Sequence, residues 1–136
     1  SGASQRHPTL SPDGKYLAYD SNESGRAEVY IRAVEGPGQW QVSAEGGYEP
    51  RWSRRGGEIF YRNADSLYAT RVDTKSGVVV GGTTALFSTR VLPPYWYDVL
   101  PNDTAFLMIR SGEAPGAHPP VVGLNFLQGV DKRAPR

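Results

Sequence analysis

The sequence predicts an all-β chain built from about three repeated antiparallel sheets, and three observations support this. The 136 residues include 16 glycines and 11 prolines, too many helix breakers for a coiled coil or a helical bundle. Tyrosine, valine, isoleucine, phenylalanine and threonine concentrate in short runs between turn residues, as is typical of strands. A motif centred on a turn also recurs along the chain, which indicates a repeat architecture.

The repeated motif has three copies. Residues 8–19 read PTLSPDGKYLAY, residues 50–61 read PRWSRRGGEIFY and residues 97–108 read YDVLPNDTAFLM, so the copies begin 42 and 47 residues apart. Each copy places one large apolar residue before a turn (Leu10, Trp52 and Val99) and continues into an apolar strand. A strand-rich period of this length is that of one four-stranded blade of a β-propeller.

The turn of the first copy has a clear physical basis. In the tract Ser11, Pro12, Asp13 and Gly14, proline suits the second position of a type I turn, aspartate bonds nearby amides and glycine accepts a positive φ. In the third copy Asp103 stands in the place of the glycine; aspartate is among the residues that best tolerate this backbone region. Each copy therefore predicts a hairpin.

The expected elements follow in order along the chain. Residues 1–6 are expected to be a tag remnant and a disordered lead, and residues 127–136 a polar tail. Three blades lie between them, over residues 7–43, 48–89 and 95–126. The expected strands lie near residues 7–11, 15–20, 27–34 and 39–43, then 48–53, 58–62, 66–73 and 84–89, and finally 95–100, 104–110 and 120–126.

Three blades, the last one a strand short, do not make a closed propeller. Closed propellers typically have at least four blades. The two end blades of an arc would expose faces that are built to pack against neighbours. We therefore expect the chain to associate with itself, with two copies completing a six-bladed ring as a homodimer of two-fold symmetry. An open dimer is the alternative.

The motifs also resemble a known family. Residues 11–19 resemble the Pro-Asp, WD-like repeat of TolB-type β-propellers, and residues 46–53 are similar to the crossing between their blades. Residues 97–99 and 106–108 look like their last full repeat, and the ending near residues 125–126 is similar to that of propellers that follow bacterial serine/threonine kinase domains. The resemblance covers nearly the whole chain. It implies binding of proteins or peptides and a periplasmic or extracytoplasmic location.

Composition excludes several other functions. Lysine and arginine number 15 and aspartate and glutamate 14, for a net charge of +1, so no strong field favours nucleic acid. The absence of cysteine excludes disulfides, thiolate catalysis and cysteine-ligated zinc. No apolar run is long enough to predict membrane insertion.

The residues also argue against catalysis. His7 and His118 are the only histidines and lack the spacing of metal ligands. Nucleophile elbows, P-loops and dinucleotide-binding glycine motifs are all missing. Asp20 and Glu23 are close in sequence, but we interpret them as solvated or turn-forming rather than as an acid–base pair. We expect no catalytic residue, metal or cofactor.

The best candidate for a binding site lies where the inner strands of the second and third blades begin. It comprises Tyr48, Glu49, Arg51, Tyr95, Trp96 and Tyr97. In a propeller these residues would surround the mouth of the central channel, and aromatic side chains beside charges could hold a peptide or a sugar. The alternative is that Trp96 or Tyr97 simply packs between blades.

Three functions remain open. The first is a non-catalytic module that binds a protein or peptide or senses a ligand, and the second is the propeller domain of a peptidase, lyase or glycan-processing enzyme. Converging carboxylates at the channel mouth would favour the enzyme. The third is a fragment without a task of its own. Separately, Arg51, Arg54 and Arg55 surround Trp52, where they either bind an anion or form a solvated hairpin end.

Overall fold

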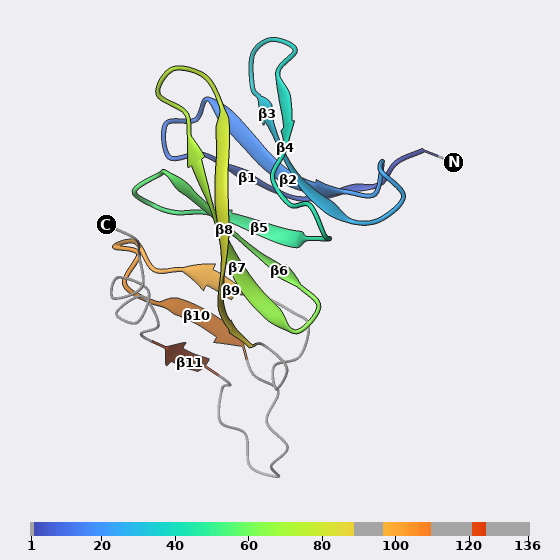
Figure 1. Ribbon diagram of the computed structural model, residues 1–136. Helices are drawn as coiled ribbons and strands as arrows, with labels where there is room; N and C mark the ends of the chain where they lie inside the picture. The colour runs from blue at the N-terminus through green and yellow to red at the C-terminus, as the bar shows by residue number, and fades with distance from the viewer. Residues whose placement is uncertain (1, 89–96, 110–120, 125–136) are drawn as a thin grey trace.

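The computed structural model of the chain is a set of three antiparallel sheets, each formed by consecutive strands (Figure 1). It describes residues 2–88, 97–109 and 121–124. All regular secondary structure in these ranges is β-strand. The described residues contain no helix long and apolar enough to cross a membrane. The predicted all-β fold and its four-stranded antiparallel sheets are thereby confirmed.

The strands follow one another in space in the order of the sequence. The first sheet contains β1 (Gln5–Leu10), β2 (Tyr16–Ser21), β3 (Glu28–Ala33) and β4 (Gln39–Gln41). The second contains β5 (Tyr48–Trp52), β6 (Glu58–Asn63), β7 (Ser66–Asp73) and β8 (Val79–Ser88). The third sheet, as far as it is described, contains β9 (Tyr97–Val99), β10 (Phe106–Ile109) and β11 (Val121–Leu124).

Two strands begin earlier than expected. β1 begins at Gln5, inside the expected disordered lead, because the amide of Ser4 already donates to Asn22 Oδ1 at 2.7 Å and ties the chain to the first sheet. β8 begins at Val79 rather than at residue 84 and pairs with the whole of β7 through two register shifts. The early part of β8 contains Gly81 and Gly82, and glycine weakens the sequence signal of a strand. The expected strand ends at residues 95–96, 110, 120 and 125–126 lie outside the described residues.

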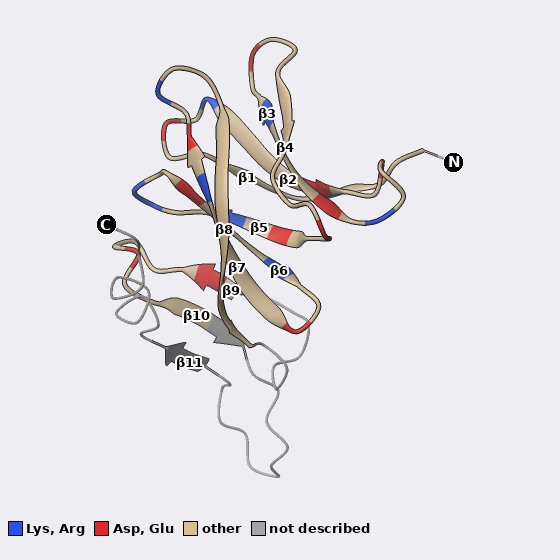
Figure 2. Cartoon of the chain, in the orientation of Figure 1, with Lys and Arg blue, Asp and Glu red and all other residues tan. Residues whose placement is uncertain are grey.

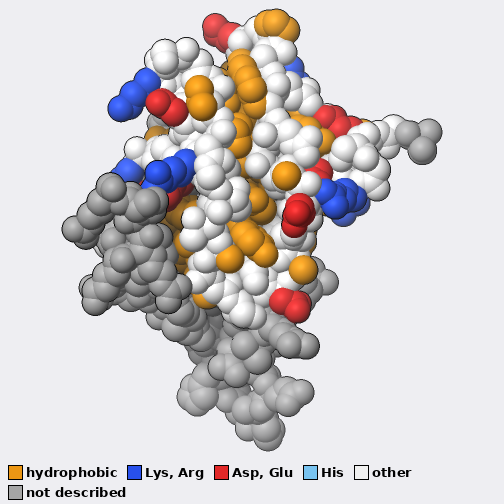
Figure 3. Space-filling model, viewed as in Figure 1, with side chains coloured by type: hydrophobic (Ala, Val, Ile, Leu, Met, Phe, Trp, Pro, Cys, Tyr) orange, Lys and Arg blue, Asp and Glu red, His pale blue; other side chains and the backbone are white. Residues whose placement is uncertain are grey.

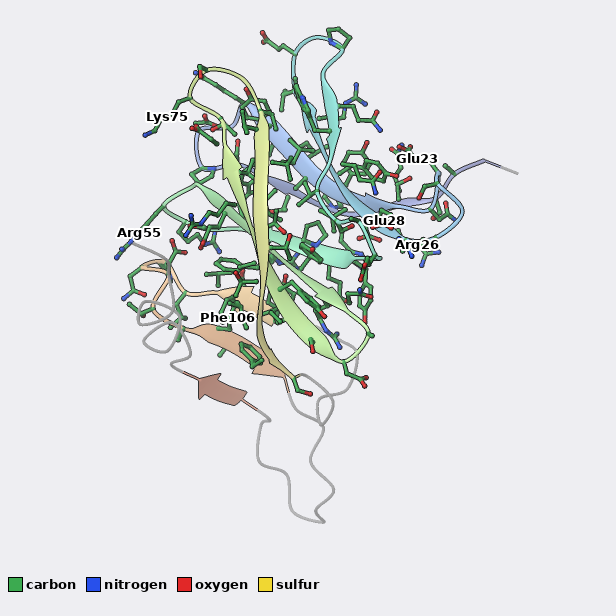
Figure 4. All side chains as sticks on the ribbon, viewed as in Figure 1. Glu23, Arg26, Glu28, Arg55, Lys75 and Phe106 are labelled. Atoms are coloured by element: carbon green, nitrogen blue, oxygen red, sulfur yellow. The ribbon has the colours of Figure 1, made fainter. Side chains whose placement is uncertain are left out.

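The sheets pack face to face in sequence order. One cluster joins the first and second sheets, formed by Ala18, Val29, Ile31, Val42, Trp52, Ile59, Tyr61 and Val72. Another joins the second and third sheets, formed by Phe60, Leu67, Ala69, Tyr97, Val99 and Phe106. Phe106 lies between the sheets (Figure 4), and its ring meets that of Phe60 edge-on at 4.8 Å. Removal of these faces from water supplies most of the driving force for folding.

The edge strands β1, β5 and β9 lie next to one another, with β5 in the middle. Two of them bend at the same repeat position. His7 in β1 and Glu49 in β5 have φ values of 50° and 56°, each stands directly before a proline, and each lies at a register shift. These residues are 42 apart, so the sequence repeat is also a repeat of backbone shape.

The first hairpin is held by the side chains of its turn. Asp13 Oδ1 accepts from the Ser11 hydroxyl at 2.6 Å and from the Lys15 amide at 3.0 Å. The hydrogen bond from Ser11 is the main reason that the pKa of Asp13 is lowered. Gly14 has a φ of 72°, a conformation that glycine adopts without strain. In the third copy Asp103 takes this backbone region, with a φ of 55°.

A buried glutamate fixes the connection between the first two sheets. The carboxylate of Glu28 accepts from Arg26 Nε at 2.6 Å, from the Gly46 amide at 3.0 Å and from the hydroxyl of Ser43 (Figure 4). A buried carboxylate must be fully hydrogen-bonded to be tolerated, and these partners satisfy it. Glu28 therefore sets where β5 begins.

Candidate binding site at the edge strands

The candidate site runs along the three adjacent edge strands and centres on β5. We call it the edge-strand site. It comprises His7 of β1, Asp20 of β2, Tyr48, Glu49 and Arg51 of β5, Arg54 of the following turn, Arg62 of β6, and Tyr97 and Asp98 of β9. Every one of these side chains contacts another member through a hydrogen bond, an ion pair or a ring contact, or contacts the backbone beside one.

Two side-chain contacts, each between an acidic and a basic residue, occupy the same repeat position with the two residue types exchanged. In the first sheet His7 Nδ1 lies 2.6 Å from Asp20 Oδ1, so the acid stands on the second strand. In the second sheet Glu49 Oε2 lies 3.4 Å from Arg62 Nη1, so the acid stands on the edge strand. Asp20 and Arg62, like His7 and Glu49, are 42 residues apart. The repeat therefore keeps an acidic residue beside a basic one, and not a particular residue at either place.

Asp20 also joins the first sheet to the second. Its buried Oδ1 accepts from the backbone amide of Glu49 at 3.2 Å as well as contacting His7. The interpretation of Asp20 as a solvated or turn-forming residue is therefore wrong. Its place within β2 turns the carboxylate toward β5, where burial requires that it find partners.

Arg62 is the buried cation of the site. Its guanidinium carbon lies 5.5 Å from the centroid of the Tyr48 ring, an arrangement of cation–π type, and Nη1 pairs with Glu49. Its Nε has no hydrogen-bond partner in the described structure. Loss of Glu49 would leave this cation buried without a counter-charge, which is strongly unfavourable.

Tyr97 supports the site from the third sheet. Its hydroxyl donates to the backbone oxygen of Glu49 at 2.7 Å, and the guanidinium of Arg51 lies 5.7 Å from its ring centroid. Burial raises the pKa of Tyr97 well above its ordinary value, and the nearby charge of Arg51 partly opposes this. Because the ring belongs to the core between the second and third sheets, Tyr97 packs between sheets, as the alternative interpretation had it.

The accessible part of the site is a small pocket at the hairpin end of the edge strands. It has a volume of about 170 Å³ and is lined by Thr9, Leu10, Pro12, Arg51, Trp52, Ser53, Arg54 and Asp98. Asp98 Oδ1 lies 3.3 Å from Arg54 Nη2 and 4.0 Å from Arg51 Nε. Two guanidinium groups share one carboxylate, so the pocket has a positive charge to spare for a carboxylate or a carbonyl oxygen of a partner.

The structure brings together four of the six predicted partner-binding residues, Tyr48, Glu49, Arg51 and Tyr97. Tyr95 and Trp96 lie outside the described residues. Sequence reasoning missed the contributions of Asp20, Arg62 and Asp98. Aligning the copies at the spacing of 42 residues would have placed Asp20 and Arg62 opposite the bends at His7 and Glu49, and so would have found the first two.

The described part of the chain contains no cluster of three histidine or acidic side chains placed to hold a metal ion. A scan against protein-family models found no match, and a search of curated proteins found none either.

Proposed function

We propose that the chain is a non-catalytic interaction module, a three-bladed arc of a β-propeller that pairs with a second copy to close a six-bladed ring. The observation that carries the proposal is the unequal burial of repeat-equivalent residues. Positions that are buried wherever the chain supplies a neighbouring sheet are exposed on the two end sheets.

The first set of equivalent residues faces the preceding sheet. It consists of Leu10, Trp52 and Val99, each of which ends an edge strand and pairs with the next strand at the same register. Trp52 is 5% exposed and Val99 3% exposed, because each packs on the sheet before it. Leu10, on the first sheet of the structure, is 57% exposed.

The second set faces the following sheet. It consists of Ala18, Phe60 and Leu107, which share one register position on the second strand of each sheet. Ala18 is 0% exposed and Phe60 1% exposed, while Leu107, on the last sheet, is 39% exposed. Each interface within the chain joins one member of each set, Trp52 with Ala18 and Val99 with Phe60. Between two copies, Leu10 of one and Leu107 of the other would form an interface with one residue from each set.

A ring of this kind satisfies both end faces at once. In a two-fold dimer the first sheet of each copy packs on the third sheet of the other, so both contacts repeat the geometry that is present within the chain. The same arrangement surrounds the ring axis with edge strands, and the pocket of Arg51, Arg54 and Asp98 then serves as the contact for a protein or peptide partner. The resemblance to TolB-type propellers supports that class of partner.

The carboxylates of the site support binding rather than catalysis. An acid–base enzyme would need carboxyl groups that reach a substrate. Asp20 is instead engaged by His7 and by an amide, and Glu49 by Arg62. Asp98 lines the accessible pocket but is paired with Arg54 and Arg51. This arrangement favours the module over a peptidase, a lyase or a glycan-processing enzyme.

Chemical cross-linking tests the head-to-tail contact directly. The chain has no cysteine, so single thiols can be introduced at Leu10→Cys and Leu107→Cys and treated with a short bis-maleimide. We expect cross-linked dimers when the two variants are mixed and little product from either variant alone, since Leu10 of one copy meets Leu107 of the other. Val79→Cys, at an exposed apolar position on the middle sheet (63% exposed), is the control. Equal products from single and mixed variants, or none at all, would contradict the proposal.

A further inference from the structure

We propose that a groove between the first and second sheets is a second binding site, which takes a ligand rich in carboxylates. The groove has a volume of about 430 Å³ and opens at the hairpin end of the molecule. It is lined by Ser11, Pro12, Asp13, Trp52, Arg55, Gly56, Gly57, Arg71, Val72, Asp73, Thr74 and Lys75. Both of its walls come from one chain, so the site exists whether or not the ring forms.

The charges of the groove favour an anion. Three cations line it, Arg55, Arg71 and Lys75, against two carboxylates. Both carboxylates are engaged by their own turns: Asp13 accepts from Ser11 and the Lys15 amide, and Asp73 accepts from the Lys75 amide at 2.9 Å.

The head groups of Arg55 and Lys75, in contrast, make no ion pair with any described residue. Their side chains project at the same end of the molecule (Figure 4), where lysines and arginines mark successive loops (Figure 2). In the space-filling view, lysine and arginine side chains (blue) lie to one side of a band of hydrophobic side chains (orange) (Figure 3). Two cations without counter-charges beside one groove point to an anionic ligand.

A tryptophan without a hydrogen-bond partner adds an independent observation. Trp52 lines the groove, and its buried indole Nε1 donates to no acceptor in the described structure. Buried donors are nearly always paired, with protein or with a bound molecule. An oxygen of a ligand in the groove would satisfy this donor if the ring turned to expose Nε1, which is now covered, while the cations hold the remaining charge.

The chemistry of the lining selects carboxylates. A guanidinium binds a planar carboxylate through two parallel hydrogen bonds, and the apolar surface of Trp52, Val72 and Pro12 suits the carbon skeleton of an organic acid. A volume of about 430 Å³ accepts either a small polycarboxylic acid or a few glutamate side chains of an acidic peptide. The two sources share one chemistry and are separated by experiment.

Titration with two probes, citrate and a tetraglutamate peptide, tests the site. The chain has three tryptophans, so its amide spectrum contains three indole signals, and Trp52→Phe identifies the one from Trp52. We expect the Trp52 indole signal to shift saturably with citrate, with tetraglutamate or with both, and the probe that binds more tightly identifies the source. N-acetylglutamine amide, a neutral probe of similar polarity, should leave the signal in place.

Charge-matched variants complete the test. The double variant Arg55→Gln with Lys75→Gln should weaken binding by about tenfold, since it removes two exposed ionic contacts. Arg6→Gln with Arg32→Gln removes the same charge from exposed residues outside the groove and should leave the affinity within about twofold. Absence of a saturable Trp52 shift with both probes would overturn the proposal, as would equal loss of affinity in the two double variants. Neither result bears on the cross-linking of Leu10 and Leu107, so the two proposals fail separately.

Discussion

Among individual residues, those that hydrogen-bond to the backbone of Glu49 join the three sheets at the edge-strand site. Asp20 sits in the first sheet and accepts the amide of Glu49 in the second, and Tyr97 in the third sheet donates to the carbonyl of that same residue. The backbone of Glu49 is thus held from both sides, at a point where its φ of 56° is unfavourable for a side chain of this size. The neighbouring sheets therefore supply the energy that keeps this bend.

The hydrogen bonds of Asp20 lead to the first prediction. Asp20→Ala should reduce the free energy of unfolding by about 1–3 kcal/mol, because the partly buried amide of Glu49 loses its acceptor. Glu23→Ala, which alters an exposed loop carboxylate nearby, should change it by less than about 0.5 kcal/mol. Urea unfolding of both variants at one protein concentration makes the comparison. Equal effects would show that Asp20 does not connect the sheets.

The buried hydroxyl of Tyr97 predicts a dependence on pH. Its pKa in the folded protein is raised by burial, so the unfolded chain gives up this proton first as the pH rises. The stability that the hydroxyl contributes is complete below the ordinary tyrosine pKa of about 10 and is lost as the pH rises above it. At neutral pH we expect Tyr97→Phe to be less stable than the parent by about 1 kcal/mol. Above pH of about 10 the difference in free energy of unfolding between the parent and Tyr97→Phe should shrink. Urea unfolding of both proteins across this pH range measures the difference, and a constant value would contradict the prediction.

At the scale of elements, the turn of the third sheet clamps the turn of the second. The carboxylate of Asp103 accepts from the Ser53 hydroxyl at 2.7 Å and from the amides of Arg54 and Arg55 at 2.8 and 2.9 Å. These bonds satisfy donors that the second hairpin leaves open, since that hairpin has arginines where the first has proline and aspartate. The turn of the first sheet is therefore held by its own aspartate, whereas the turn of the second sheet is held by Asp103 of the third.

The clamp gives a prediction that separates its carboxylate from its backbone. Asp103→Gly keeps the φ of 55° without strain but removes three hydrogen bonds, so we expect a loss of about 1–3 kcal/mol in the free energy of unfolding. Asp103→Asn retains one side-chain acceptor and should lose less. Thermal unfolding ranks the two variants. If Asp103→Gly were as stable as the parent, the clamp would contribute nothing.

The elements themselves were largely predictable from sequence, while the contacts among them were not. Alternating apolar residues and turn residues located every strand, since those signals are local. β8 was missed in part because Gly81 and Gly82 interrupt its strand signal, and because its early residues pair only through the partner that β7 offers. The ion pairs, the clamp at Asp103 and the groove around Trp52 join residues on separate strands and turns, so they depend on packing that no local pattern encodes.

For the whole molecule, we expect the outer faces of the first and third sheets to decide whether the chain associates with itself. Leu10 and Leu107 are exposed, although their repeat equivalents are buried, and an apolar side chain left in water forgoes about 1.5–3 kcal/mol of burial energy. Leu107→Asp should abolish self-association because it places a charge in the contact, while Val79→Asp on the middle sheet should not.

The most direct test of the central claim is sedimentation equilibrium of the unmodified chain at tens of micromolar. Two copies closing a ring predict a single species with twice the mass of one chain, which falls to the mass of one chain in Leu107→Asp and is unchanged in Val79→Asp. A parent protein that sediments with the mass of one chain over this concentration range would contradict the ring.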